Sequence, residues 1–312
     1  MNLLGWQKTK FFQLYLNRVV TFYLFIFLVS LAFVDYEEVK EKSNVQTLNR
    51  FKPASYKYLV DLSQGKAAPN TVQLKQYLRY YQKVAENMPS QSGAYVMEGV
   101  CHYYLGDLDK ALESFKKAVA MNPNVALYRQ NLGVLYYKLG DFRQANENFL
   151  QVIRNTVNPA KNFEYLSLSK VFRPLIVQAG INSEETAREQ MQADYKSAYA
   201  LLIVSYFRMG EYANVLRYSL AAIELNLPGG DFHYLAGLGA YHLNQFQTAA
   251  VYFKKYIERR ADNPDAYYYL GHSLKAIGLG EFADNFLRTA QQKDEDHDEV
   301  IANIENVHPQ FF

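Results

Sequence analysis

The apolar and polar positions of the chain follow the period of an α-helix, and one segment recurs at a fixed step. "YYLGDLDKA" (103–111) returns 34 residues later as "YKLGDFRQA" (137–145). Related segments lie around Gly210, Asn244 and Gly278, so five segments keep one phase with a single gap of double length. Each segment has the pattern of two amphipathic helices joined by a tight turn. The pattern therefore predicts an all-α chain built from an internal repeat.

The recurring positions around each turn have physical explanations. Gly or Asn at the turn indicates a left-handed backbone conformation, which a Cβ atom makes costly. Small residues recur where the two helices of a unit must approach closely: Gly99, Gly133, Gly237 and Gly271 on the first helix, Ala111, Ala145, Ala249 and Ala283 on the second. One turn further along the second helix are Phe115, Phe149 and Phe253, which we expect to fill the space between units.

This pattern of small and aromatic positions resembles the tetratricopeptide repeat (TPR) family. The runs "NLGVLYYKLGDFRQA" (131–145) and "YLAGLGAYHLNQFQTAAVYF" (234–253) carry the resemblance most clearly. The unit that begins at Lys196 departs from it, because Ile203, Val215 and Ser219 replace the expected Gly, Ala and aromatic residue. The resemblance implies a superhelical solenoid of helix-turn-helix units whose first helices line a concave, peptide-binding face.

The expected organisation places the repeats behind a distinct N-terminal region. We expect a membrane anchor or signal peptide at 1–34, a stalk at 35–55, a degenerate first repeat at 56–91, two TPR units at 92–159, a divergent helical unit at 160–195, three TPR units at 196–297 and a C-terminal tail at 298–312. The expected fold class is thus an N-terminal transmembrane helix followed by an all-α TPR-type solenoid.

The N-terminal region contains an uncharged apolar run, "VVTFYLFIFLVSLAFV" (19–34). Lys8, Lys10 and Arg18 precede this run, whereas acidic residues predominate after it. The positive-inside rule then predicts a single-pass protein with a cytoplasmic N-terminus and the repeats on the periplasmic or extracytoplasmic side. The small residues of "SLA" (30–32) leave a cleaved signal peptide as the alternative, and both interpretations send the repeats across the membrane.

Composition and motifs provide no site for catalysis. Lys and Arg total 33 against 31 Asp and Glu, so no nucleic-acid partner is expected. The single cysteine, Cys101, and the scattered histidines form no metal-ligand pattern, and we expect no enzyme activity, cofactor or metal site. Acidic residues near the C-terminus (Asp294, Asp296, Asp298 and Glu305) are spaced as in a calcium loop. Glu299 stands where that loop needs Gly, so they are expected to cap the last helix and solvate the open end of the array.

The candidate site is therefore the surface of the first helices. The resemblance assigns one groove row to Tyr103, Tyr137, Phe207 and Tyr241, and a second row to Val100, Val134, Val204 and Leu238, with Gln130, Tyr234 and Tyr268 beside them. The same aromatic side chains could instead pack the fold. The rows are uncharged, so partner binding there is expected to resist salt.

These observations predict a membrane-anchored scaffold that binds a partner protein and helps assemble or stabilise an envelope or membrane complex. Its expected contacts are the subunits of that complex and, through the N-terminal helix, membrane lipid. The alternative is a fixed structural accessory subunit that is held through its transmembrane helix and exchanges no ligand.

Overall fold

The computed structural model describes residues 48, 50–155, 171–181, 184–228, 231–293, 299–306 and 308. Regular structure in these ranges is helical throughout, with no strand among them. The helices are α2 (Lys57–Ser63), α3 (Thr71–Asn87), α4 (Ser92–Tyr104), α5 (Leu108–Met121), α6 (Ala126–Lys138), α7 (Phe142–Asn155), α9 (Arg173–Gln178), α10 (Glu184–Arg208), α11 (Tyr212–Glu224), α12 (Asp231–His242), α13 (Phe246–Ile257), α14 (Pro264–Ala276), α15 (Gly280–Gln292) and α16 (Glu299–Glu305).

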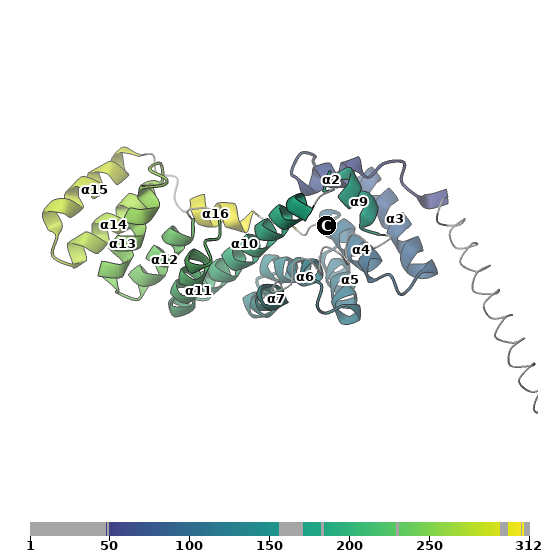
Figure 1. The fold of residues 1–312 in the computed structure, drawn as a ribbon, viewed down its shortest axis with the longest axis horizontal. Helices are drawn as coiled ribbons and strands as arrows, with labels where there is room; N and C mark the ends of the chain where they lie inside the picture. Colours follow the sequence, from purple (N-terminus) through teal and green to yellow (C-terminus); the bar gives the residue numbers. More distant parts are fainter. Residues whose placement is uncertain are drawn as a thin grey trace, which may run out of the picture.

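Five helix pairs form an elongated array (Figure 1). They are α4 with α5, α6 with α7, the second half of α10 with α11, α12 with α13, and α14 with α15. Helix α3 packs on α4 at one end of the array, and α14 and α15 form the other end. The expectation of an all-helical, TPR-like solenoid is thus confirmed for the described part of the chain.

The turn residues have the backbone conformation that the sequence predicts. The φ angles of Gly106, Gly140, Gly210 and Gly278 are 85°, 79°, 72° and 84°, and that of Asn244 is 59°. These values lie in the left-handed region, which glycine enters without a Cβ clash and asparagine tolerates better than most residues. Each first helix can therefore stop and reverse within a few residues.

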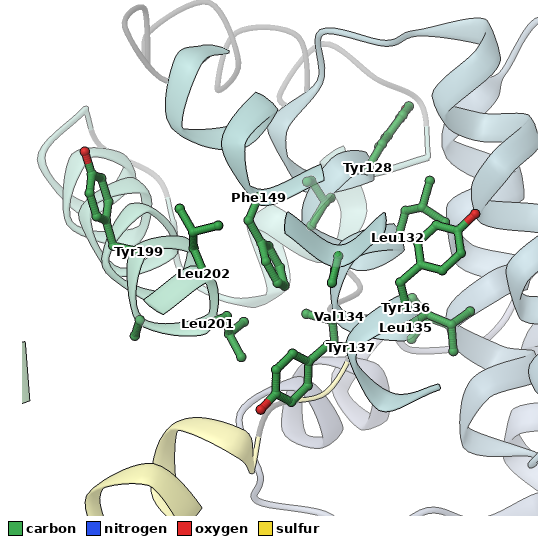
Figure 2. Packing of buried hydrophobic residues seen from close by; sticks show 14 of the residues in the cluster. Tyr128, Leu132, Val134, Leu135, Tyr136, Tyr137, Phe149, Tyr199, Leu201 and Leu202 are labelled. Atoms are coloured by element: carbon green, nitrogen blue, oxygen red, sulfur yellow. The ribbon is translucent and has the colours of Figure 1, made fainter. Parts of the chain in front are cut away.

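Within a unit, the glycine of the first helix lies against the aromatic side chain of the second. A Cβ atom on Gly133 would come within 2.7 Å of the Phe149 ring, and one on Gly99 within 2.5 Å of the Phe115 ring. The close neighbour of Gly133 is thus Phe149, one turn beyond the Ala145 that we expected. Figure 2 shows Phe149 between α6 and the α10 residues Leu201 and Leu202, so the ring also fills space between units.

The α10–α11 unit is closely packed without the glycine–aromatic pair. Ile203, Val215 and Ser219 are all fully buried. Ile203 and Ser219 hold the positions of Gly133 and Phe149, so the large side chain has moved from the second helix to the first. Exchanging volume across a contact preserves packing density, which explains why this divergent unit keeps its helices together.

The described part of the 160–195 region begins with a segment that returns to the start of the array. Helix α9 contacts α2, and Phe172, just before α9, is fully buried. A Cβ atom on Gly93 would meet the Phe172 ring at 2.6 Å, and the rings of Tyr128 and Phe172 are 6.2 Å apart. Phe172 thereby joins this segment to α4 and α6.

The predicted anchor and most of the predicted stalk lie outside the described residues. Among the helices that the structure describes, none has both the length and the apolar character needed to span a bilayer. The anchor and the extracytoplasmic location of the array therefore remain predictions.

The C-terminal end of the chain folds back onto the array. Helix α16 lies beside α10 near the middle of the molecule, away from α15, its neighbour in sequence (Figure 1). Val300 and Ile301 of α16 are buried, and Ile304 packs on the core. This helix occupies the face formed by the first helices, where the sequence predicts partner binding.

Candidate functional site

The first predicted row lies at the C-terminal ends of four first helices. Tyr103, Phe207 and Tyr241 are partly buried, and Tyr137 is 7% exposed. We call the surface formed by these ends of α4, α6, α10 and α12 the inner face. Tyr103 and Tyr137 direct their hydroxyl groups to the C-terminal segment, by which we mean α16, Asn306 and His308.

The second predicted row is part of the core. Val100, Val204 and Leu238 are fully buried, and Val134 is 1% exposed. Of the residues predicted beside the rows, Gln130 and Tyr234 are also buried, whereas Tyr268 is 45% exposed on α14. A partner in contact with the structure as it stands would meet Tyr268 and the partly buried members of the first row, Tyr103, Phe207 and Tyr241. The binding role of each residue stays a prediction.

The carboxylate of Glu305 is the centre of a hydrogen-bonded cluster on the inner face. Arg208 of α10 donates from Nε to Oε1 at 2.6 Å and from Nη2 to Oε2 at 2.8 Å. Tyr137 of α6 donates its hydroxyl to Oε1 at 2.5 Å. The two parallel Arg208 contacts match the planar guanidinium to the planar carboxylate, the geometry that gives arginine its preference for carboxylates.

Two further contacts fix the segment that follows Glu305. Lys138 donates from Nζ to the main-chain oxygen of Glu305 at 2.6 Å, where α16 ends. A cation there satisfies a carbonyl that the helix itself leaves unpaired. The hydroxyl of Tyr103 lies 2.7 Å from Nδ1 of His308, whose ring also contacts Tyr104.

The ionisation of Glu305 fits this cluster. Burial raises the pKa of the carboxyl, but hydrogen bonds from Arg208 and Tyr137 and the charges of Arg208 and Lys138 outweigh it, so the net pKa is lowered. Conversely, the hydrogen bond to Glu305 raises the pKa of the Arg208 guanidinium. Burial and the charge of Lys138 lower the pKa of His308. The docked segment therefore favours an ionised Glu305 and a neutral His308.

A cleft of about 460 Å³ runs beside α16. Its walls come from α10, α12 and α16, with Lys196, Phe232 and Asn303 among the lining residues. Arg260 and Asp231 form an ion pair of 3.4 Å at its border. The C-terminal segment thus leaves part of this face open to solvent.

The charged residues of this site were not among those predicted from the sequence. Lys138 and Arg208 each directly follow a member of the first row, Tyr137 and Phe207, and this adjacency was the available signal. The residues of the two predicted rows are uncharged, but both of these neighbouring cations bind Glu305. The expected salt resistance of partner binding stays a prediction. The role expected for Glu305, capping or solvating the open end, is wrong, since its carboxylate pairs near the middle of the array.

Sequence and structure comparisons agree with the helical repeat fold. A family model described as "TPR repeat" matches residues 101–140, and one described as "Tetratricopeptide repeat" matches 129–155. A similar solved structure is that of YrrB, described as a TPR protein with an unusual peptide-binding site. It is 16% identical, with 73% of this chain and 98% of that chain covered and a TM-score of 0.51.

PilF of Pseudomonas aeruginosa is similar to the same degree. It is 15% identical, with 85% of this chain and 98% of that chain covered and a TM-score of 0.51. None of the curated proteins matches this chain in sequence. The chain thus contains TPR repeats within residues 101–155 and has the fold of a TPR solenoid. That fold indicates a protein–protein interaction scaffold, a class whose members are typically not catalysts.

Proposed function

We propose that this chain is a membrane-anchored scaffold that binds a partner protein through its inner face and helps assemble or stabilise a membrane or envelope complex. The observation that carries the proposal is the docked C-terminal segment. In it, α6 and α10 hold one short helix by apolar burial, a paired carboxylate and a capped carbonyl, and α4 contacts His308 beyond the end of that helix. A surface that accommodates a helix of this chain has the shape and polar groups to accommodate one from a partner.

The membrane part of the proposal rests on the N-terminal sequence. The apolar run at 19–34, with Lys8, Lys10 and Arg18 before it, supports an anchor with the array on the extracytoplasmic side. Protease added to intact spheroplasts should then digest the region beyond Asp35. Digestion that occurs only after lysis would place the array in the cytoplasm.

A second candidate function is a fixed accessory subunit without an exchangeable ligand. One observation favours it: the chain's own C-terminal segment fills part of the inner face. In this case the inner face would be a structural contact, and the partner would be held elsewhere, through the N-terminal region.

The two candidates differ in what an inner-face substitution does to partner recovery. We would extract the full chain with a mild detergent, isolate it by an affinity tag and quantify co-purifying proteins by mass spectrometry. Phe207→Ala removes a partly buried aromatic side chain of the inner face. Loss of such an anchor costs about 2 kcal/mol, so partner recovery should fall by about thirtyfold.

The matched control is Phe282→Ala on α15, whose side chain is 64% exposed and lies outside the first row. Circular dichroism must show both variants to be as helical as the natural chain. Equal recovery with Phe207→Ala and Phe282→Ala would reject the inner face as the binding site and favour the accessory subunit.

A further inference from the structure

The inner face carries a built site for a carboxylate at the end of a helix. Its donors come from two helices that are far apart in sequence from their ligand: Tyr137 and Lys138 on α6, and Arg208 on α10. They bind both oxygens of the Glu305 side chain and its main-chain oxygen. The site is therefore specific for a negative charge and for the direction of the helix that carries it.

We propose that this site recognises an acidic helical segment of the partner protein, and that the C-terminal segment of this chain is a ligand mimic that the partner displaces. The proposal rests on the proposed function and adds the chemistry of the partner. The recognised segment has a branched aliphatic residue one turn before a carboxylate, as Ile301 stands before Glu305, and the helix ends at that carboxylate. Ile301 is 1% exposed and supplies the apolar part of the contact.

The exposure of the cluster makes the segment replaceable. The side chains of Glu305 and Arg208 are 24% and 45% exposed, so solvent reaches the pair and screens it. A helix as short as α16, with seven residues, is marginal without its packing partners. The segment is therefore held by a few contacts that a partner helix of the same chemistry can supply equally well.

The covalent link sets the affinity that a competitor must have. A tethered segment experiences an effective concentration of about 1 mM or more when its linker is short. Because the segment is docked, its own dissociation constant for the site is below that effective concentration. A free peptide with the same sequence must then bind an emptied site at millimolar concentration, which makes the proposal testable with a defined probe.

The first experiment measures docking by hydrogen exchange in the full chain. Glu305→Gln and Arg208→Gln should each accelerate amide exchange in residues 299–306 by about tenfold, and the double variant should add little, because both remove one interaction. The matched controls are Glu281→Gln on α15 and Arg143→Gln on α7, both exposed and neither among the residues that bind Glu305. Unchanged exchange in the Glu305 and Arg208 variants would overturn the docked arrangement.

The second experiment measures recognition with a fluorescent synthetic peptide of residues 299–308. The peptide should bind the Glu305→Gln chain at least tenfold more tightly than the natural chain, whose own segment competes. Adding Arg208→Gln to the Glu305→Gln chain should abolish this gain. A peptide that carries Gln in place of Glu305 and keeps Glu299 should bind weakly to all three chains. Equal binding to the three chains, or none at millimolar peptide, would overturn the proposal.

Two other outcomes separate this proposal from the proposed function. If the natural chain is a dimer in sedimentation and Arg208→Gln makes it a monomer, the segment docks between copies, and the intramolecular mimic is wrong. If the peptide binds as expected but Phe207→Ala leaves partner recovery unchanged, the carboxylate site stands and the proposed function fails. If partner recovery depends on Phe207 but not on Arg208, the function stands and the acidic ligand is wrong.

Discussion

The unit of α6 and α7 and the unit of α10 and α11 pack against each other, yet they fill their cores differently. In the first unit, Gly133 leaves room for the ring of Phe149. In the second, Ile203 and Ser219 occupy the corresponding positions and are both fully buried. The summed volume of the two side chains at this contact is thus similar in both units, and either helix can provide the larger side chain.

On the inner face the same two units are alike. Each first helix ends in an aromatic residue followed by a cation, Tyr137 with Lys138 and Phe207 with Arg208. Both cations bind Glu305, one at the main chain and one at the carboxylate. The core of a unit can therefore change its packing without changing the groups that it presents for binding.

The largest expected difference between the two cores follows from truncating their second helices. Phe149→Ala removes a fully buried ring and should lower the free energy of unfolding by about 3–5 kcal/mol. Ser219→Ala at the corresponding position removes one hydroxyl and should change it by about 1 kcal/mol or less. Urea denaturation followed by circular dichroism measures both values. Similar losses would mean that the two positions are not equivalent.

A transplant sharpens the comparison. Gly133→Ile alone places a side chain against the Phe149 ring and should cost about 1–3 kcal/mol. Combined with Phe149→Ser, which copies the α10–α11 arrangement, it should cost less than the sum of the single changes by about 1–3 kcal/mol. Strict additivity in the same denaturation assay would refute the idea of exchanged volume. Arg143→Ala on the exposed side of α7 is the neutral control.

The aromatic residues of the two inner faces, Tyr137 and Phe207, differ by one hydroxyl group. Tyr137→Phe removes the hydrogen bond to Glu305 and should weaken docking of the C-terminal segment by about 1 kcal/mol, seen as faster amide exchange in residues 299–306. Tyr241→Phe, at the corresponding position of α12, is the matched control and should leave this exchange unchanged. An equal effect of the two substitutions would argue against a specific contact.

The smallest expected effect is a dependence of docking on pH. His308 faces Tyr103, Tyr104 and Lys138, and its pKa in the docked segment lies below the ordinary value of 6.5. As the pH falls below 6.5, the undocked segment therefore binds more protons than the docked one, and docking weakens. Glu305, which faces Arg208, Tyr137 and Lys138, has a docked pKa below 4.5. Its contribution is present above pH 4.5 and is lost as the pH falls through the docked value.

Hydrogen exchange in residues 299–306, corrected for its intrinsic pH dependence, measures this effect. His308→Gln should remove the weakening that begins near pH 6.5 and retain the later one. Docking that strengthens on acidification would contradict both assignments.

Much of the architecture follows from the periodic sequence, because its causes are local. A glycine or asparagine is needed wherever a first helix ends in the left-handed conformation, and this alone locates Gly140 and Asn244. The small and aromatic positions recur because each unit repeats one helix contact. Periodicity did not separate surface positions from core positions equally well. Val134 and Tyr137 lie three residues apart on one helix face. Only the neighbouring helices decide that Val134 is buried and that the Tyr137 hydroxyl can bind Glu305.

The sequence by itself therefore determined the helices, their turns and the side of the array that carries Tyr103 and Tyr137. Only the tertiary structure decided what that side binds. The contact of Tyr137 with Glu305 joins residues 168 positions apart, and no repeat period relates them. Such a contact depends on the position of α16 in the folded chain. That position depends on every turn and every helix-crossing angle that precedes it. A local pattern cannot carry that information, so the carboxylate site becomes visible only in the folded chain.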